Sequence, residues 1–216
     1  MTNDSIKTRI FYTKLNFAKY ISHLDVTRCM QRALKRADLP VWYTQGFNPH
    51  IYLTFALPLS LGYESECEVM DIRLNEEVPF EEIAERFNAV LPADIRVTKV
   101  ALPIKSAESI TKALYEIKLY GDVNKIEVDL LETILADEIL VQKKTKKKDF
   151  KIIDIKPDIE VFDIKKTDEY LHFNLMASAG NEKNISPSLL LEKIENVTAK
   201  SILRKKLICD DGESFQ

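Results

Sequence analysis

The feature that most constrains the fold is a series of strand-like and helix-like segments that occurs twice. Segments rich in aromatic and β-branched residues predict strands, and apolar residues at a spacing of three or four predict helices. In the first series we expect strands at 7–15, 41–44, 51–57, 67–74 and 95–102 and helices at 22–37 and 79–90. We interpret this order as β-α-β-β-α-β, in which the segments 41–44 and 51–57, on either side of one turn, together take one strand position.

The second series follows a polar connection at residues 105–109. It predicts helices at 124–137 and 186–194 and strands at 113–120, 139–144, 159–166, 170–177 and 198–208. The second half therefore repeats the element order of the first with one extra strand. We predict an α+β protein made of two tandem ferredoxin-like (β-α-β-β-α-β) halves with antiparallel sheets, covering residues 1–104 and 105–216.

The charges are unevenly distributed along the chain. The whole sequence carries a formal net charge of -3. Residues 1–62, however, contain eight Lys or Arg against three acids, so this part is at about +5 and the remainder at about -8. A basic surface on an acidic protein indicates an anionic partner such as RNA.

The composition argues against several classes of protein, namely membrane, secreted, disulfide-bonded and zinc-binding proteins. No apolar run approaches the roughly 18 residues that a membrane helix needs, so we expect no membrane contact. The first ten residues lack the apolar core of a secretion signal, and the expected compartment is the cytoplasm. The three cysteines, at 29, 67 and 209, fit neither a disulfide framework nor a zinc motif. We therefore predict no cofactor and no metal.

The helix at 22–37 begins with a clear start signal. Ser22 is the expected N-cap and Asp25 the third helical residue, as in an S-x-x-D capping box. Helix capping is enough to explain these two residues, with no need for a binding or catalytic role. It does not explain His23, which lies in the first turn, where free N–H groups and the helix dipole favour an anion. His23 is therefore a candidate for phosphate binding or for acid-base chemistry.

The same helix carries a basic face. Helical spacing places Asp25 on one side of the helix with four cations, Arg28, Arg32, Lys35 and Arg36. A solubilising exterior is the simpler interpretation of this face. The alternative is that the four cations contact phosphates of a nucleic acid.

A second cluster occupies the segment Y-T-Q-G-F-N-P-H at 43–50. Gly46 permits a positive φ, and Asn48 before Pro49 favours an extended or turn conformation, so the loop is held in shape. The sequence leaves open at which end of the preceding helix the loop lies. Our hypothesis places it at the helix start, where His23 and His50 would meet. The candidate residues that the loop would contribute are Gln45, Gly46, Phe47, Asn48 and His50.

Such a pair of histidines has three possible roles: acid-base catalysis, phosphate binding, or metal binding with Asp25 as third ligand. Metal binding is the least supported, because the spacing matches no ligand motif.

A lysine-rich segment is the third candidate. It contains Lys143, Lys144, Lys146, Lys147, Lys148 and Lys151. Such a run is typical of a solvated hairpin tip. It would extend an RNA-binding surface through Lys144 and Lys147 only if it faced the same way as the basic helix.

Residues 20–74 carry a family resemblance through S-H-L-D, R-x-x-x-R-A, Q-G-F-N-P-H and L-G-x-x-S. In these motifs the chain resembles the radical-SAM-linked protein family, a bacterial domain of unknown function that is fused to, or encoded beside, a radical-SAM protein. The resemblance implies a radical-SAM partner, and the frequent proximity to ribosomal-protein and ribonuclease genes implies RNA or a ribosomal component as substrate. The chain lacks the C-x-x-x-C-x-x-C motif of the radical enzyme itself.

Three hypotheses follow. The first is an accessory RNA-binding protein that works with the radical-SAM partner on RNA or the ribosome. The second is an RNA-processing or RNA-modifying enzyme that uses His23 and His50 as acid and base. The third is a scaffold that binds the partner protein through its second half.

Overall fold

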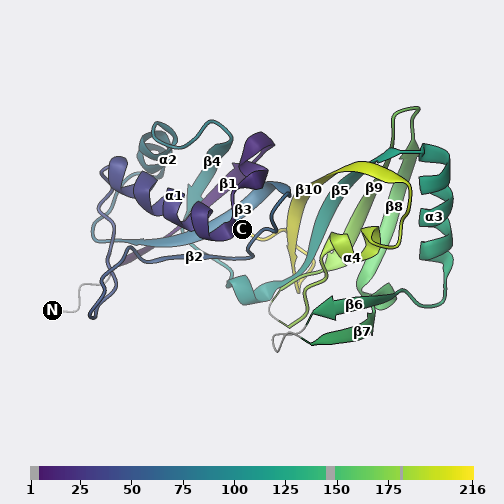
Figure 1. The fold of residues 1–216 in the computed structure, drawn as a ribbon. Coiled ribbons are helices and arrows are strands. Elements are labelled where there is room, and N and C mark those ends of the chain that lie inside the picture. Colours follow the sequence, from purple (N-terminus) through teal and green to yellow (C-terminus); the bar gives the residue numbers. More distant parts are fainter. Residues whose placement is uncertain (1–4, 145–148, 181) are drawn as a thin grey trace. The chain divides into compact units, whose positions relative to one another are not determined.

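The computed structural model describes residues 5–144, 149–180 and 182–216, which form two compact units (Figure 1). The N-terminal unit comprises Met1–Ala107 and Gln216, and the C-terminal unit comprises Glu108–Phe215. The described residues form a mixed α+β structure with four α-helices and antiparallel strand pairs. None of the helices in these residues is long and apolar enough to cross a membrane.

The N-terminal unit is an antiparallel sheet with its helices on one face. Its elements are β1 (Ile6–Lys14), α1 (His23–Arg36), β2 (Leu53–Phe55), β3 (Glu64–Leu74), α2 (Phe80–Asn88) and β4 (Ile95–Ala101), with a short 3-10 helix, η1 (Asn16–Tyr20), before α1. The strand order is β4-β1-β3-β2, and every pair is antiparallel. The buried residues of α1 and α2 form one core with the inward residues of β1, β3 and β4.

The core of this unit follows from two spacings of apolar residues in the sequence, every third or fourth residue in the helices and every second residue in the strands. Met30 and Leu34, one turn apart on α1, are fully buried, as are Ile10 of β1 and Ile72 of β3. Residues at i and i+4 share one side of a helix, whereas alternate residues share one face of a strand. The helix therefore covers one face of the sheet, and the opposite face holds the residues in between, such as Arg9 and Arg73.

The segment between α1 and β2 is a hairpin held by isolated bridges. Val41 pairs with Leu74 and Tyr43 with Ile51. The Trp42 amide donates to the Arg73 carbonyl at 2.8 Å. Strands were expected at 41–44 and 51–57, but regular pairing is confined to β2. We name residues 41–52 the 41–52 hairpin.

The C-terminal unit has its own buried core and an additional hairpin. Its elements are β5 (Ile110–Gly121), α3 (Val123–Leu135), β6 (Leu140–Lys144), β7 (Phe150–Asp154), β8 (Ile159–Lys166), β9 (Tyr170–Ser178), α4 (Pro187–Leu191) and β10 (Val197–Cys209), with short 3-10 turns at Ala107–Ser109 and Lys156–Asp158. Within this unit the strand order is β10-β5-β9-β8, and β6 pairs with β7 in a two-stranded sheet. The sequence predicted one extra strand, and the structure has two, because β7 pairs with β6 as a hairpin outside the main sheet.

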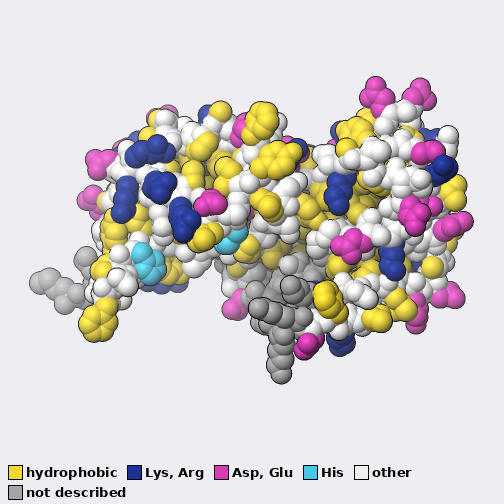
Figure 2. All heavy atoms as spheres, in the orientation of Figure 1, with side chains coloured by type: hydrophobic (Ala, Val, Ile, Leu, Met, Phe, Trp, Pro, Cys, Tyr) yellow, Lys and Arg dark blue, Asp and Glu magenta, His cyan; other side chains and the backbone are white. Residues whose placement is uncertain are grey.

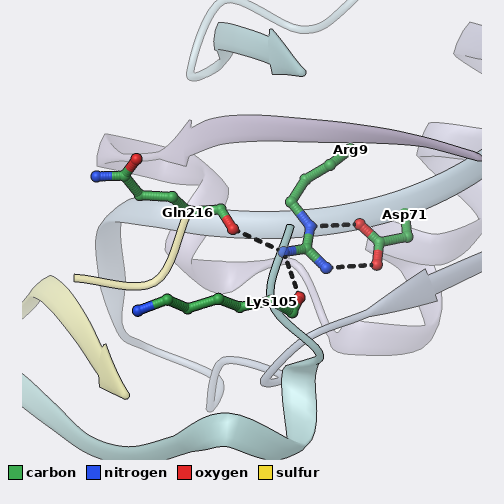
Figure 3. Close-up of polar contacts among 4 residues, drawn as sticks. All are labelled: Arg9, Asp71, Lys105 and Gln216. Carbon is green, nitrogen blue, oxygen red and sulfur yellow. Dashed lines mark hydrogen bonds and ion pairs between the residues drawn. The ribbon is translucent and has the colours of Figure 1, made fainter. Parts of the chain in front are cut away.

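A buried arginine links the last segment of the N-terminal unit to its sheet. Arg9 is 1% exposed, and its guanidinium bonds to both Asp71 carboxylate oxygens, at 2.7 and 2.8 Å (Figure 3). Its Nη1 also donates to the carbonyls of Lys105 and Gln216, at 2.8 and 2.9 Å. These bonds satisfy the buried charge and hold two backbone segments against the open face of the sheet.

Candidate nucleic-acid interface

The start of α1 is organised by Ser22. The Ser22 Oγ accepts a hydrogen bond from the Asp25 amide at 3.2 Å and donates to Asp25 Oδ2 at 2.7 Å. Asp25 Oδ1 in turn accepts from Arg28 at 3.2 Å. The Ser22 hydroxyl, followed by Arg28, lowers the pKa of the Asp25 carboxyl. Asp25 therefore stays ionised and is engaged with its own helix, which leaves it little capacity to ligate a metal.

The four cations of α1 do share one surface. Arg28, Arg32, Lys35 and Arg36, together with Asp25 and Cys29, line an open depression of about 580 Å³. Figure 2 shows Lys and Arg side chains gathered over α1. We name Arg28, Arg32, Lys35 and Arg36 the α1 basic surface.

The four cations differ in what already binds them. Arg36 Nη2 donates to the Val90 carbonyl at 2.7 Å, and Arg28 pairs with Asp25. Lys35 Nζ lies 5.7 Å from the centre of the Tyr43 ring. Arg32 is exposed and makes no hydrogen bond or ion pair with the described residues. Arg32 and Lys35 therefore keep the most donors for an external anion.

Cys29 lies within this surface as a half-buried thiol. Burial raises the pKa of the Cys29 thiol, and Arg36 and Arg32 offset this only in part. A raised pKa keeps the thiol protonated near neutral pH, which does not favour a nucleophile.

His23 is exposed at the first position of α1. Its ring packs edge-on against Phe55 of β2, with 4.8 Å between ring centres. This contact places the end of β2 at the start of α1.

His50 closes the loop at 45–49. Its Nδ1 lies 3.1 Å from both Thr44 Oγ1 and the Asn48 carbonyl, and its amide donates to Thr44 Oγ1 at 3.1 Å. Gly46 has φ of 131°, which a side chain would strain. Gln45, Gly46, Phe47 and Asn48 are all exposed, with Phe47 projecting fully into solvent.

The structure separates the two histidines, so the expectation that the loop folds against the helix start is wrong. His50 lies five residues before Phe55 on nearly extended backbone, a separation of about 16 Å. Tyr43, at the loop end of the hairpin, contacts Lys35 in the last turn of α1, whereas His23 contacts Phe55. The reason is that Pro40 leads the chain into the hairpin where α1 ends, so the loop extends from that end. The two imidazoles cannot share one substrate atom.

Only part of the lysine-rich segment lies within the described residues. Lys143 Nζ donates to the Asn184 carbonyl at 2.8 Å. The side chain of Lys144 and the whole of Lys147 lie outside the described residues.

Sequence reasoning missed a second group of cations and aromatic rings, around Arg73 of β3. The Arg73 guanidinium lies 4.5 Å from the Tyr52 ring centre and 5.4 Å from that of Trp42. The two rings are 6.0 Å apart at 71°. The alternation of the hairpin strands was the available signal, because it puts Trp42 and Tyr52 on the face opposite the core residues Val41 and Ile51.

Comparison with known proteins gives a family and weak structural likenesses, two of which are described below. Residues 7–187 match a family described as "Uncharacterized protein conserved in bacteria (DUF2344)". No curated protein matches the chain. A crystal structure of a Cbf5-Nop10-Gar1 complex is 12% identical with a TM-score of 0.46, covering 93% of this chain and 48% of that one. An unknown protein from Galdieria sulphuraria is 13% identical with a TM-score of 0.27 and 81% coverage of each chain.

Proposed function

We propose that this chain, which belongs to the bacterial DUF2344 family, is a cytoplasmic accessory protein that binds RNA or a ribosomal component for a radical-SAM partner. The observation that carries the RNA-binding part is the α1 basic surface. Four cations within three turns of one helix line a single depression, while the whole chain has a net charge of -3. The radical-SAM partnership is supported by the sequence motifs at 20–74.

The chemistry of this surface suits a phosphate backbone. Arginine forks bind phosphate oxygens in pairs, and exposed cations gain affinity by displacing counterions from the nucleic acid. Arg32 forms no ion pair with the described residues, and Arg28 can exchange its exposed pairing with Asp25 for a phosphate at little cost. Arg36, tied to the Val90 carbonyl, holds one end of the surface in place.

We further propose that each unit is a ferredoxin-like half. The strand orders β4-β1-β3-β2 and β10-β5-β9-β8, with helices after the first and third strands of each, support this assignment. Such a half offers one sheet face without helices, and single-stranded RNA commonly binds that kind of face.

The test is RNA affinity over a series of salt concentrations. If Arg28 and Arg32 contact phosphates, then Arg28→Ala with Arg32→Ala weakens binding and reduces the slope of log affinity against log salt by about 0.7 per lost contact. Lys112→Ala with Lys200→Ala is the matched control, because both lysines are exposed in the C-terminal unit and the charge change is the same. Equal loss in the two double variants, or no loss in either, would contradict the proposal.

The scaffold alternative predicts a different pattern. It expects the partner protein to bind the C-terminal unit and RNA affinity to be unaffected when the α1 basic surface is neutralised. A pull-down with the proposed radical-SAM partner, using wild type and the α1 double variant in parallel, separates partner binding from RNA binding. The two-histidine enzyme has no supporting geometry, because His23 and His50 lie at opposite ends of α1.

A further inference from the structure

The open sheet face of the N-terminal unit carries a compact group of four side chains. Trp42 and Tyr52 come from the two arms of the 41–52 hairpin, and Arg73 from β3 beside them; the Tyr52 amide donates to the Trp42 carbonyl at 3.1 Å. Lys7 of β1 is the direct cross-strand partner of Arg73. Direct partners in a sheet point to the same face, so two cations and two aromatic rings come together here.

Arg73 packs against two aromatic rings, and no acid among the described residues forms an ion pair with it. Its guanidinium stacks near the Tyr52 and Trp42 rings, and its Nε is buried without a hydrogen-bond partner among the described residues. Arg9, on the same face, shows the contrast, because Asp71 neutralises it with two hydrogen bonds. A stacked guanidinium with no anion retains its capacity to bind one.

We propose that Trp42, Tyr52, Arg73 and Lys7 bind one unpaired nucleotide of RNA. The base stacks on the aromatic side chains, and Arg73 and Lys7 contact its phosphate. This inference rests on the proposed RNA-binding function and deepens it by assigning a single-stranded substrate. A paired base in a duplex does not expose its ring face to protein, whereas an unpaired base can stack on aromatic and guanidinium planes.

The hairpin connects this site to the α1 basic surface. Trp42 and Tyr43 are adjacent and point to opposite faces of the hairpin, since neighbouring strand residues alternate. Tyr43 contacts Lys35 on the helix side, and Trp42 contacts Arg73 on the open side. A single strand that crosses the hairpin edge would therefore meet cations paired with aromatic rings on both sides.

The wild-type protein carries its own reporter, because Trp42 is its only tryptophan. We expect an eight-nucleotide single-stranded oligoadenylate to change Trp42 fluorescence saturably, as a stacked base would. An eight-base-pair RNA duplex is expected to bind through its phosphates with little change in Trp42 emission.

Substitutions then measure the stacking. Tyr52→Leu is expected to weaken oligoadenylate binding by about tenfold, since stacking of one base contributes roughly that much. Arg73→Gln, made separately, is expected to weaken it by about tenfold as well, because it removes a charge-assisted hydrogen bond to the phosphate. Phe17→Ala is the matched control, because Phe17 is an exposed aromatic in the same unit. Thermal melting of each variant shows whether it is folded, and the fluorescence titration of the wild type needs no substitution at all.

The outcomes separate this site from the proposed function. Saturable RNA binding with unchanged Trp42 emission and wild-type affinity in Tyr52→Leu would overturn the nucleotide site and leave the α1 basic surface standing. Quenching and loss in Tyr52→Leu, with no effect of Arg28→Ala and Arg32→Ala, would support the nucleotide site and contradict the role of α1. No RNA binding by the wild type would overturn both.

Discussion

Arg9 shows what an arginine needs in order to be buried in a strand. The guanidinium has five N–H donors, and the structure supplies two carboxylate oxygens and two backbone carbonyls for it. Its partners are far apart in the sequence, at residues 71, 105 and 216. The single side chain therefore joins β1, β3, the segment after β4 and Gln216.

We predict that Asp71→Asn strongly destabilises the N-terminal unit. The substitution leaves the Arg9 guanidinium buried without its counter-charge, which costs about 3 kcal/mol. Chemical denaturation followed by circular dichroism measures the free energy of unfolding. Glu82→Gln is the control, because it removes an exposed pair with Arg86 and should change stability by less than about 1 kcal/mol. A loss in Asp71→Asn no larger than in this control would show that Arg9 does not depend on Asp71.

At the scale of the element, the two faces of α1 and its first turn have different roles. One face supplies Met30 and Leu34 to the core, and the opposite face carries the α1 basic surface. At the first turn, Ser22 satisfies the Asp25 amide and, together with Arg28, fixes the Asp25 carboxylate. The cap therefore also orients a residue of the basic surface.

We predict that Ser22→Ala raises the pKa of Asp25 towards its ordinary value of 3.8, because the Ser22 hydrogen bond is the largest cause of the lowering. In the wild type the folded pKa lies below the unfolded one. The contribution of Asp25 to stability is therefore present above the unfolded pKa and is lost as pH falls through the folded pKa. In Ser22→Ala this acid-dependent loss becomes smaller.

Carboxyl titration by NMR provides the measurement. Asp122, the N-cap of α3, is the internal control, because the Lys125 amide lowers its pKa independently of Ser22. An unchanged Asp25 titration in Ser22→Ala, with the helix intact, would contradict the role assigned to the cap.

At the scale of the whole molecule, the charge distribution matters more than the net charge. The first 62 residues are basic and the rest of the chain is acidic. An anionic polymer should therefore be attracted to part of the N-terminal unit and repelled by much of the remaining surface.

We predict that ultraviolet crosslinking of single-stranded RNA, followed by peptide mass spectrometry, yields crosslinks mainly within residues 22–55. The control is the same experiment at high salt, where crosslinks through the α1 basic surface should decline because phosphate contacts are salt-dependent. Crosslinks confined to residues 108–215 would show that RNA binds the C-terminal unit instead. Additional crosslinks at residues 143–151 would show that the lysine-rich segment takes part.

Local patterns in the sequence were enough to locate the helices. The expected helices at 22–37 and 79–90 correspond to α1 and α2, and Ser22 caps α1 as its S-x-x-D pattern predicted. The shared basic face of α1 was also predicted, because residues three or four apart on a helix are neighbours whatever surrounds them. These features depend on contacts within about four residues.

Only the tertiary structure decided where the loop at 45–49 lies and which residues meet on the open sheet face. His23 and His50 are separated because the hairpin leaves the far end of α1, a fact that depends on the path of the whole β-α-β unit. Arg73 meets Tyr52, and Arg9 meets Asp71, through strand pairings that join residues 21 and 62 positions apart. Strand register depends on which faces are buried together, and a single segment of sequence does not contain that information.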